Sequence, residues 1–408
     1  MSRHPVFLLI VIIFTANLVA CYGPGTKHGK EIRADARARI AIFNSQLAYD
    51  QAMQAFRTGQ FDKAMRQIDG ALKLTPDVPE FYILMGRIFM ETHRLEQANK
   101  AFVKAIELNP NSADSHYYLG IVYQRWSNEQ SAYEYYIKAH ELDNSTVQFV
   151  LAAAESLIAL SKFDEAQLFI ESKMDYFEHN ASMKQLLGQI ALLLGNAADA
   201  AQIFTEARLL NPDDEMLLEE LAHAQYVAGL YGKCYDSVKQ LQRLKKGFTL
   251  ETKQLEARCL VALGRTTEAR NLYLELTRSD PSNTELWIEL GSLAWEIGDF
   301  RRTALCSVRI VALAPHRYEG YMLKGIYERE KGNLDQATSL LRQSAALSND
   351  VALPHMVLGR TLEENGDVKG ALGAYANALR ADPDNQAAKE LFQGLSYAPN
   401  LSKLPGRP

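Results

Sequence analysis

The sequence has few cysteines and lacks the short motifs that mark common enzymes and metal sites. Four cysteines occur in 408 residues, and no CxxC, HExxH, GxSxG or P-loop pattern is present. The nine histidines are scattered, with no two at the spacing that would place metal ligands on one helix face. These absences predict that the chain is not an enzyme and has no catalytic residue, no bound cofactor and no metal site.

An excess of basic charge and a long apolar run are also missing. Lys and Arg number 44 against 49 Asp and Glu, a net charge of −5, so there is no basic field from which nucleic-acid recognition could start. The N-terminal apolar run, residues 6–19, is shorter than the ~20 residues that a membrane-spanning helix needs. A short apolar run behind Arg3 is typical of a secretory signal peptide, here residues 1–20. Neither nucleic acid nor a small-molecule substrate is expected as a partner.

The residues after the apolar run indicate how the protein is held at a membrane. Leu18-Val19-Ala20-Cys21 resembles the bacterial lipobox, in which cleavage occurs before the cysteine and its thiol takes a diacylglycerol. The resemblance implies that Cys21 is lipidated, and two or three acyl chains hold a protein on a bilayer more firmly than one. Tyr22 follows the cysteine where aspartate would favour the inner membrane, which points to the outer membrane. A plain cleaved signal peptide with a chance cysteine is the alternative.

Residues 21–44 lead from the lipidated cysteine into the rest of the chain. Tyr22–Lys30 contains three glycines and a proline and predicts a short flexible tether. Glu31–Asn44 carries isoleucines and arginines at helical spacing and predicts a leading helix that continues into the following segment. Its arginines either rest on anionic headgroups or form the solvated face of the helix.

From residue 45 onward the residue pattern repeats every 34 positions, ten times. One column of small residues shows the period: Ala64, Ala98, Ala132, Ala166, Ala200, Cys234, Ala269, Thr303, Ala337, Ala371. Each step in this column is 34 residues, except the step from Cys234 to Ala269, which is 35. A period of roughly 20–50 residues marks a solenoid of stacked supersecondary units. Such a fold is a surface for holding other molecules.

We number the residues of each repeat so that the column above is position 20. Other columns then describe the structure expected of each unit. Position 8 is always glycine or alanine, from Ala52 to Gly359, which predicts a close helix crossing. Position 15 is glycine in seven repeats, which predicts a left-handed cap at the end of the first helix. Position 24 is mostly large and apolar, and position 32 is often a proline that ends the second helix. Each unit is therefore expected to be a helix, a turn, a second helix and a turn.

These columns resemble the tetratricopeptide repeat. Small residues at positions 8 and 20, an aromatic near position 11 (Phe89, Tyr123) and proline at position 32 carry the resemblance, which covers Ser45 to about Leu395. It implies an all-α fold, a right-handed superhelical solenoid of about ten helix-turn-helix repeats plus a C-terminal capping helix. The repeats are expected to start near residues 45, 79, 113, 147, 181, 215, 250, 284, 318 and 352, with the cap at 386–395 and a disordered tail at 396–408.

Two features of the array are left open by the sequence. The extra residue within Gln242–Thr249 is either a weak joint between two sub-arrays or a long surface turn. Cys234, Cys259 and Cys306 lie in expected helices and are interpreted as small core residues. A disulfide between Cys234 and Cys259 is the alternative, which an exported compartment would permit.

In the tetratricopeptide family the first helices line a concave face, mainly through positions 2, 5, 9, 12 and 13, and the resemblance implies two grooves here. The N-terminal groove is aromatic and methionine-rich with arginines: Tyr49, Met53, Phe56, Arg57, Ile83, Arg87, Met90, Tyr117, Ile121, Gln124, Arg125. The C-terminal groove is mainly acidic with Trp295 as an anchor: Glu285, Ile288, Ser292, Trp295, Glu296, Glu319, Met322, Arg329, Glu330, Arg360, Glu363, Glu364. The apolar anchors rimmed by arginine in the N-terminal groove suit a peptide or helix with acidic and apolar residues. For any single residue, packing against a neighbouring repeat is the alternative.

The resemblance implies a binding scaffold, and the N-terminal signal places it in a bacterial cell envelope. We expect a lipid-anchored scaffold, facing the periplasm from the outer membrane, on which an envelope complex assembles, with a pilus or secretion apparatus as the first candidate. One alternative is a non-catalytic regulatory or substrate-binding subunit of a cell-wall or exopolysaccharide enzyme complex, and another is a purely structural envelope protein. The expected partners are segments of protein subunits and the membrane, with a homo-oligomer also open.

Overall fold

The computed structural model describes residues 27–244, 249–348 and 350–401, and within these residues every regular element is an α-helix. The prediction of an all-α fold is confirmed. The expected signal peptide, Cys21 and the residues up to Thr26 lie outside the described part, as do residues 402–408. The chain divides into two compact units, residues 1–211 and 212–408, and each is described by itself.

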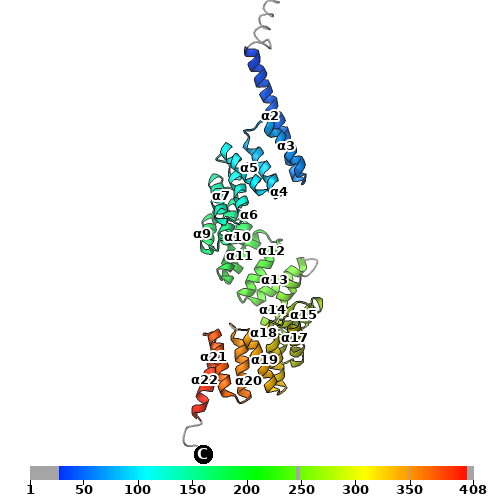
Figure 1. The fold of residues 1–408 in the computed structure, drawn as a ribbon, viewed down its shortest axis with the longest axis vertical. Coiled ribbons are helices and arrows are strands. Elements are labelled where there is room, and N and C mark those ends of the chain that lie inside the picture. The colour runs from blue at the N-terminus through cyan, green and yellow to red at the C-terminus, as the bar shows by residue number, and fades with distance from the viewer. Residues whose placement is uncertain (1–26, 245–248, 349, 402–408) are drawn as a thin grey trace, which may run out of the picture. The chain divides into compact units, whose positions relative to one another are not determined.

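Unit 1 holds ten helices in its described residues (Figure 1). They are α2 (Lys27–Arg57), α3 (Phe61–Leu74), α4 (Pro79–Glu91), α5 (Leu95–Leu108), α6 (Ala113–Arg125), α7 (Glu129–Leu142), α8 (Val147–Ala159), α9 (Phe163–Met174), α10 (Ala181–Leu193) and α11 (Ala197–Leu210). The helix α2 is longer than the others because it joins the leading segment to the first helix of the first repeat.

Unit 2 holds eleven helices in its described residues. They are α12 (Glu215–Val227), α13 (Tyr231–Leu244), α14 (Leu250–Ala262), α15 (Thr266–Ser279), α16 (Thr284–Glu296), α17 (Phe300–Leu313), α18 (Tyr318–Glu330), α19 (Leu334–Leu347), α20 (Ala352–Glu364), α21 (Val368–Ala381) and α22 (Gln386–Leu401).

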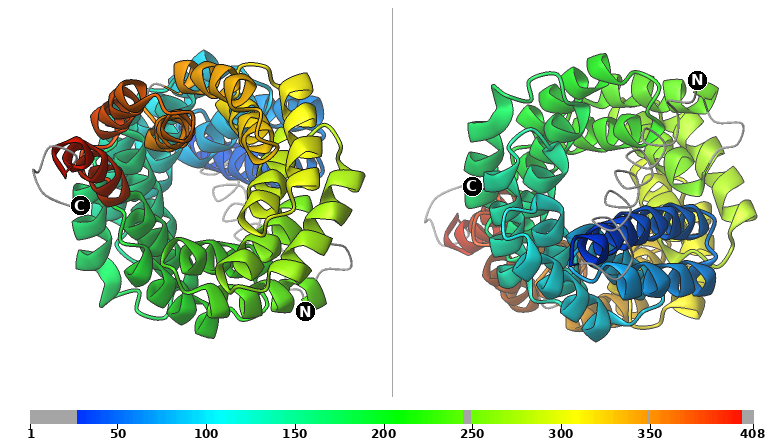
Figure 2. Two further views of the ribbon diagram at one scale, coloured as in Figure 1. Left: turned by 90° about the horizontal axis from the view of Figure 1, so that it is seen from below. Right: turned by 90° about the horizontal axis from the view of Figure 1, so that it is seen from above.

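Within each unit, consecutive helices pack as pairs, and the pairs stack side by side (Figures 1 and 2). The first helix of a repeat also contacts the first helix of the next one, as α4 contacts α6 in unit 1 and α16 contacts α18 in unit 2. The first helices of a unit therefore form one layer and the second helices another. Positions that recur on the first helices are brought onto a common face.

The glycine of position 8 is required by the ring at position 24 of the same repeat. A Cβ atom added to Gly86 would lie 2.5 Å from the Phe102 ring, and one added to Gly359 would lie 2.3 Å from the Tyr375 ring. Both rings are fully buried. Position 8 is thus small because an aromatic side chain from the second helix crosses directly over the first.

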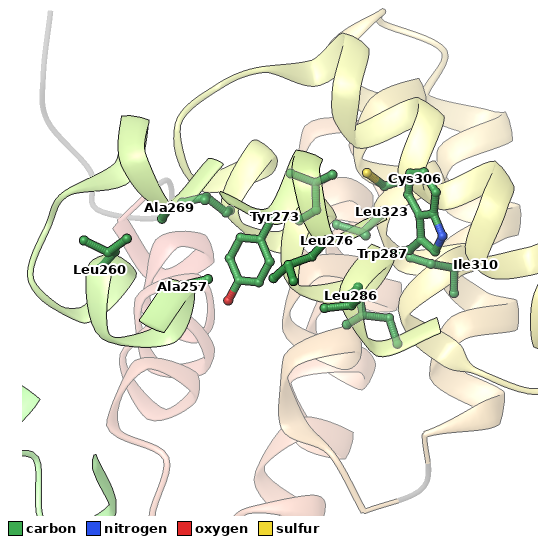
Figure 3. Packing of buried hydrophobic residues seen from close by; sticks show 13 residues of the cluster. Ala257, Leu260, Ala269, Tyr273, Leu276, Leu286, Trp287, Cys306, Ile310 and Leu323 are labelled. Carbon is green, nitrogen blue, oxygen red and sulfur yellow. The ribbon is translucent and has the colours of Figure 1, made fainter. Parts of the chain in front are cut away.

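The core of unit 2 shows how this packing adapts when the large residue is missing (Figure 3). The eighth repeat has Ser307 at position 24, and the space beside Gly291 is filled instead by Leu323 from the next repeat and by Cys306. Leu323 and Cys306 are fully buried in this cluster with Trp287 and Tyr273. The repeats are therefore held together by contacts between neighbours as well as within each helix pair.

The left-handed cap at position 15 forms whether or not glycine is present. The seven glycines of this column have φ between 71° and 82°. The second, third and fourth repeats have His93, Ser127 and Ser161 there, with φ of 56–59°. Because a side chain in this region of backbone space costs about 1–2 kcal/mol, these three turns are strained relative to the glycine turns.

We expect Ser161→Gly to raise the free energy of unfolding of unit 1 by about 0.5–1 kcal/mol, since relief of the left-handed conformation exceeds the extra freedom of the unfolded chain. Gly195→Ser, at the same position of the next repeat, should lower it by a similar amount. Urea unfolding followed by circular dichroism measures both changes, and shifts of the same sign would contradict this account of the turn.

The segment Gln242–Thr249 does not divide the chain. The boundary between the units lies at Asn211 and Pro212, and the helices on both sides of the segment, α13 and α14, belong to unit 2. The carboxylate of Glu256 on α14 accepts hydrogen bonds from Lys239 Nζ at 2.5 Å and from the Gln242 side chain, both on α13. Residues 245–248 of the segment lie outside the described residues.

All three cysteines beyond Cys21 are buried and free, which agrees with their interpretation as core residues. Cys234 on α13 and Cys259 on α14 touch through sulfur atoms 2.9 Å apart, so they add to the contact between these helices. The disulfide that the sequence left as an alternative is not formed.

Both ends of the described chain differ from the sequence-based expectation. Helix α2 starts at Lys27, so residues 27–30, which were expected to belong to a flexible tether, are helical; the earlier residues of that segment lie outside the described part. The tail is expected to be disordered from residue 396; α22 spans Gln386–Leu401, and residues 402–408 of the tail lie outside the described residues. Phe392 and Leu395 of α22 pack into the core of unit 2.

Candidate interaction surfaces

The first helices of unit 1 are linked by an arginine held between two aromatic rings. The guanidinium carbon of Arg87 on α4 lies 4.7 Å from the ring centroid of Phe56 on α2 and 5.2 Å from that of Tyr118 on α6. Cation–π contacts of this kind contribute about 0.5–1 kcal/mol each at exposed sites. Two residues of the predicted N-terminal groove are thus brought together, and Tyr118, which lies outside the groove columns, completes the stack.

Most of the other predicted N-terminal residues are engaged by neighbouring side chains. Tyr49 stacks on Phe81 with ring centroids 5.3 Å apart, and Tyr117 lies 5.0 Å from Phe149. The Tyr49 and Tyr117 rings are half-buried, and burial raises the pKa of both tyrosines, which keeps their hydroxyls neutral. At these positions packing against an adjacent repeat describes the side chains better than an open groove.

The polar members of the same set also have partners inside the repeat array. Arg125 Nη1 donates to the Met90 carbonyl oxygen at 2.9 Å, and the Met90 side chain is only 4% exposed. Gln124 Oε1 accepts a hydrogen bond of 2.9 Å from the Tyr136 hydroxyl. Met53, Ile83 and Ile121 are half-buried, whereas Arg57 is exposed. The structure therefore places the set on successive first helices, where much of it holds the repeats together.

Unit 2 contains an open cavity of about 450 Å³ that is lined by residues of three first helices and of the last helix. Four elements line it: α16, α18, α20 and α22. The lining residues are Trp295, Arg329, Leu353, Met356, Val357, Arg360, Ala387, Glu390 and Leu391. Trp295 and Arg329 occupy position 12 of successive repeats, while Leu353, Met356 and Arg360 occupy positions 2, 5 and 9 of the tenth repeat. The cavity is thus built from the columns that the sequence singled out.

The charges around this cavity differ from the mainly acidic groove expected from the sequence. Glu285 and Glu319 both pair with Arg317, at 2.5 and 2.7 Å. Arg329 lies between Glu330 and Glu364, at 3.4 and 3.7 Å. The Tyr375 hydroxyl donates to Glu363 at 3.0 Å. Much of the acidic charge is therefore balanced inside the unit, and the cavity itself presents two arginines and one glutamate beside an apolar floor.

The prediction from the sequence omitted some residues of this site and included others that are buried in the core. Leu353 and Met356 lie at positions 2 and 5 of the tenth repeat, for which the prediction included only positions 9, 12 and 13. Ala387, Glu390 and Leu391 come from α22, which follows the last repeat and has no column to predict its contacts. Conversely, Ile288 and Met322 are buried, whereas Glu296 is exposed.

Neither a metal-binding cluster nor a spanning helix occurs in the described residues. No group of three or more His, Cys, Asp or Glu side chains is placed there to hold a metal ion. No helix between residues 27 and 401, as far as it is described, is long and apolar enough to cross a bilayer.

Comparison with known families finds tetratricopeptide repeats in both units. The family model described as TPR repeat matches residues 86–125, and the model described as Tetratricopeptide repeat matches residues 255–302 and 322–386. Similar proteins include the cellulose synthase 2 operon protein C of Komagataeibacter xylinus, 28% identical over 264 residues, which is 60% of this chain and 20% of that protein. Tetratricopeptide repeat protein 8 of mouse is 25% identical over 122 residues, 30% of this chain and 24% of that protein. The chain spans a quarter or less of the length of these relatives.

Solved structures with a similar arrangement have low identity to this chain. The structure from the functional characterisation of Pseudomonas aeruginosa pilF is 23% identical, covers 51% of this chain and 94% of that chain, and has a TM-score of 0.43. The Cut9–Hcn1 hetero-tetramer structure is 14% identical, covers 88% and 97%, and has a TM-score of 0.45. The family matches show tetratricopeptide repeats at residues 86–125, 255–302 and 322–386, and the 34-residue register and the stacked helix pairs agree with them. Repeats of this kind form surfaces for binding other proteins.

Proposed function

We propose that the protein is a membrane-anchored scaffold on which the subunits of a bacterial envelope complex assemble, held by lipid on Cys21 at the periplasmic face of the outer membrane. A pilus or secretion apparatus is the first candidate for that complex. The observation that carries the scaffold role is the cavity of unit 2, where an indole, two guanidinium groups and an apolar floor meet on one face. Buried aromatic and arginine anchors supply most of the binding energy in protein interfaces.

A segment that fits this cavity has a bulky apolar side chain and a carboxylate close together. The apolar group would cover Leu353, Met356 and Leu391, and the carboxylate would meet Arg360, which is exposed. An arginine can bind a carboxylate through two parallel hydrogen bonds, which adds direction as well as energy. This chemistry describes a short acidic and apolar helix or peptide from another subunit.

The comparison with known proteins supports a second candidate complex. The relative from Komagataeibacter xylinus is named for a cellulose synthase operon, which favours a non-catalytic subunit of an exopolysaccharide enzyme complex. Site-specific photo-crosslinking in intact envelopes separates the two candidates. A crosslinker at Leu353, which lines the cavity, should capture one envelope protein, and the identity of that protein names the complex. A crosslinker at Leu209, 79% exposed on α11, is the matched control.

The anchor is tested by changing the predicted lipid-bearing residue. Cys21→Ser removes the only thiol in the lipobox-like sequence, so we expect complete loss of metabolic labelling by radioactive palmitate. The wild-type chain should be labelled and should remain with membranes after a high-salt wash. Equal labelling of both proteins, or none of either, would show that Cys21 is not the attachment site.

A further inference from the structure

The first half of α2 carries apolar side chains that the rest of the described chain leaves uncovered. Every residue from Lys30 to Ile40 is exposed. Five large apolar residues have exposed fractions of 45% (Ile32), 59% (Ile40), 59% (Ile42), 69% (Phe43) and 47% (Leu47). Exposed residues of this size in one short helix segment call for a partner surface.

Four of these five side chains form a single stripe, and Ile42 lies outside it on another side of the helix. With 3.6 residues per turn, Ile32, Ala36, Ile40, Phe43 and Leu47 fall within an arc of about 80° on the helix surface. Ser45 and Ala52, which are buried in the first repeat, lie on the opposite side of the helix. The apolar face of α2 therefore changes side along its length, and the stripe points away from the core that the second half builds.

The segment is basic although the whole chain is acidic. Residues 27–44 contain five Lys and Arg against two Asp and Glu, a local net charge of +3, compared with −5 for the chain. Arg33 and Arg37 follow one edge of the stripe, and Arg39 follows the other, where it pairs with Asp35 at 2.7 Å. An apolar stripe edged by arginines is the pattern of a helix that lies in the headgroup region of a bilayer.

We propose that the first half of α2 lies flat in the surface of an anionic membrane, with the stripe at the acyl boundary and the arginines among the phosphates. The proposed place of α2 at the bilayer surface rests on the proposed lipid anchor. Cys21 is six residues before Lys27, and a chain of that length reaches at most about 20 Å. The helix is thus kept within reach of the bilayer by the lipid. Membrane contact orients the first repeat relative to the surface and makes the anchor stronger than the acyl chains alone.

The same stripe suits a second copy of the chain less well. Pairing two of these helices would bring two segments of net charge +3 together, and like charges at a helix interface oppose association. The stripe also spans fewer than the three to four heptads that mark a stable coiled coil. Charge complementarity therefore selects an anionic lipid surface.

The test uses the unlipidated chain that begins at Tyr22, so that binding does not depend on acyl chains. We expect it to sediment with vesicles of phosphatidylglycerol and phosphatidylcholine, but not with phosphatidylcholine alone, and to be released by salt. Ile40→Asp combined with Phe43→Asp should weaken the partitioning by roughly tenfold or more, because two inserted side chains are lost. Leu209→Asp on α11 is the matched control and should bind as the wild type does.

Three outcomes would overturn the proposal. They are absence of binding to the anionic vesicles, binding that the double substitution leaves unchanged, and a concentration-dependent dimer that the double substitution abolishes. Circular dichroism of each variant shows that the repeats are folded, since the substituted side chains are exposed. Failure of lipid labelling at Cys21 would leave vesicle binding untouched, so the two proposals fail independently.

Discussion

Replacing Phe102 by alanine is expected to lower the free energy of unfolding of unit 1 by about 3–5 kcal/mol. The Phe102 ring is fully buried, lies over Gly86 in the same repeat and stacks on Tyr118 of the next repeat with ring centroids 5.6 Å apart. Alanine would leave a void that α4, α5 and α6 border, and the rigid helix pairs can close it only in part. Urea unfolding followed by circular dichroism measures the loss, and Leu209→Ala, an exposed position, should change it by less than about 0.5 kcal/mol.

A second substitution tests whether the ring itself causes the loss. In the wild-type background Gly86→Ala should cost about 1–3 kcal/mol, because its Cβ would lie 2.5 Å from the Phe102 ring. In the Phe102→Ala background the same change should become stabilising by about 0.5–1 kcal/mol, since alanine favours the helix and the collision is gone. Additive effects of the two substitutions would mean that position 8 is small for another reason.

Reversing the charge of Arg360 is expected to reduce capture of the partner at the unit 2 cavity by about 30-fold or more, corresponding to the 2 kcal/mol or more of an interface anchor. Arg360→Glu would place a carboxylate beside Glu390 and opposite the acidic group proposed for the ligand. Because Arg360 is exposed, the fold should be retained. The yield of the product from a crosslinker at Leu353 measures the effect in intact envelopes.

The matched control is a charge reversal on the other helix layer of the same repeat. Arg380→Glu on α21 changes an exposed arginine whose partner is Asn377, and it should leave the crosslinking yield unchanged. Trp295→Phe keeps an aromatic ring in the cavity and should retain part of the binding. Equal loss from Arg360→Glu and Arg380→Glu would indicate a general electrostatic effect and would remove the cavity as the docking site.

The repeat columns predicted the helix pairs because they record contacts that every repeat must make. Gly86 and Phe102 are sixteen residues apart in one unit, and the ring can cross the first helix only where no side chain stands in the way. The glycines at position 15 likewise predicted the left-handed turn at the end of the first helix. His93, Ser127 and Ser161 nevertheless adopt the same turn, because the helices on either side fix the backbone.

The candidate surfaces were predicted less completely. Trp295, Arg329 and Arg360 do share the cavity, because one position per repeat recurs on the same side of the first-helix layer. Tyr49 and Tyr117 satisfied the same rule, yet they stack on Phe81 and Phe149, which a single column cannot reveal. The C-terminal groove was predicted to be mainly acidic, but the columns could not show that Arg317, which lies outside them, pairs with Glu285 and Glu319.

Residue order was therefore sufficient for the period and the helix pairs, since both depend on contacts within a repeat or with the next one. The open surfaces depended on tertiary structure. Whether a first-helix residue can meet a partner is decided by side chains roughly one period away, such as Phe81 beside Tyr49, or by an element without a repeat, such as α22 beside Met356. Packing and ion pairing between repeats bury some of the expected groove residues and leave others exposed to solvent. Which residues are buried depends on how the helices of neighbouring repeats pack, and the sequence pattern does not contain that information.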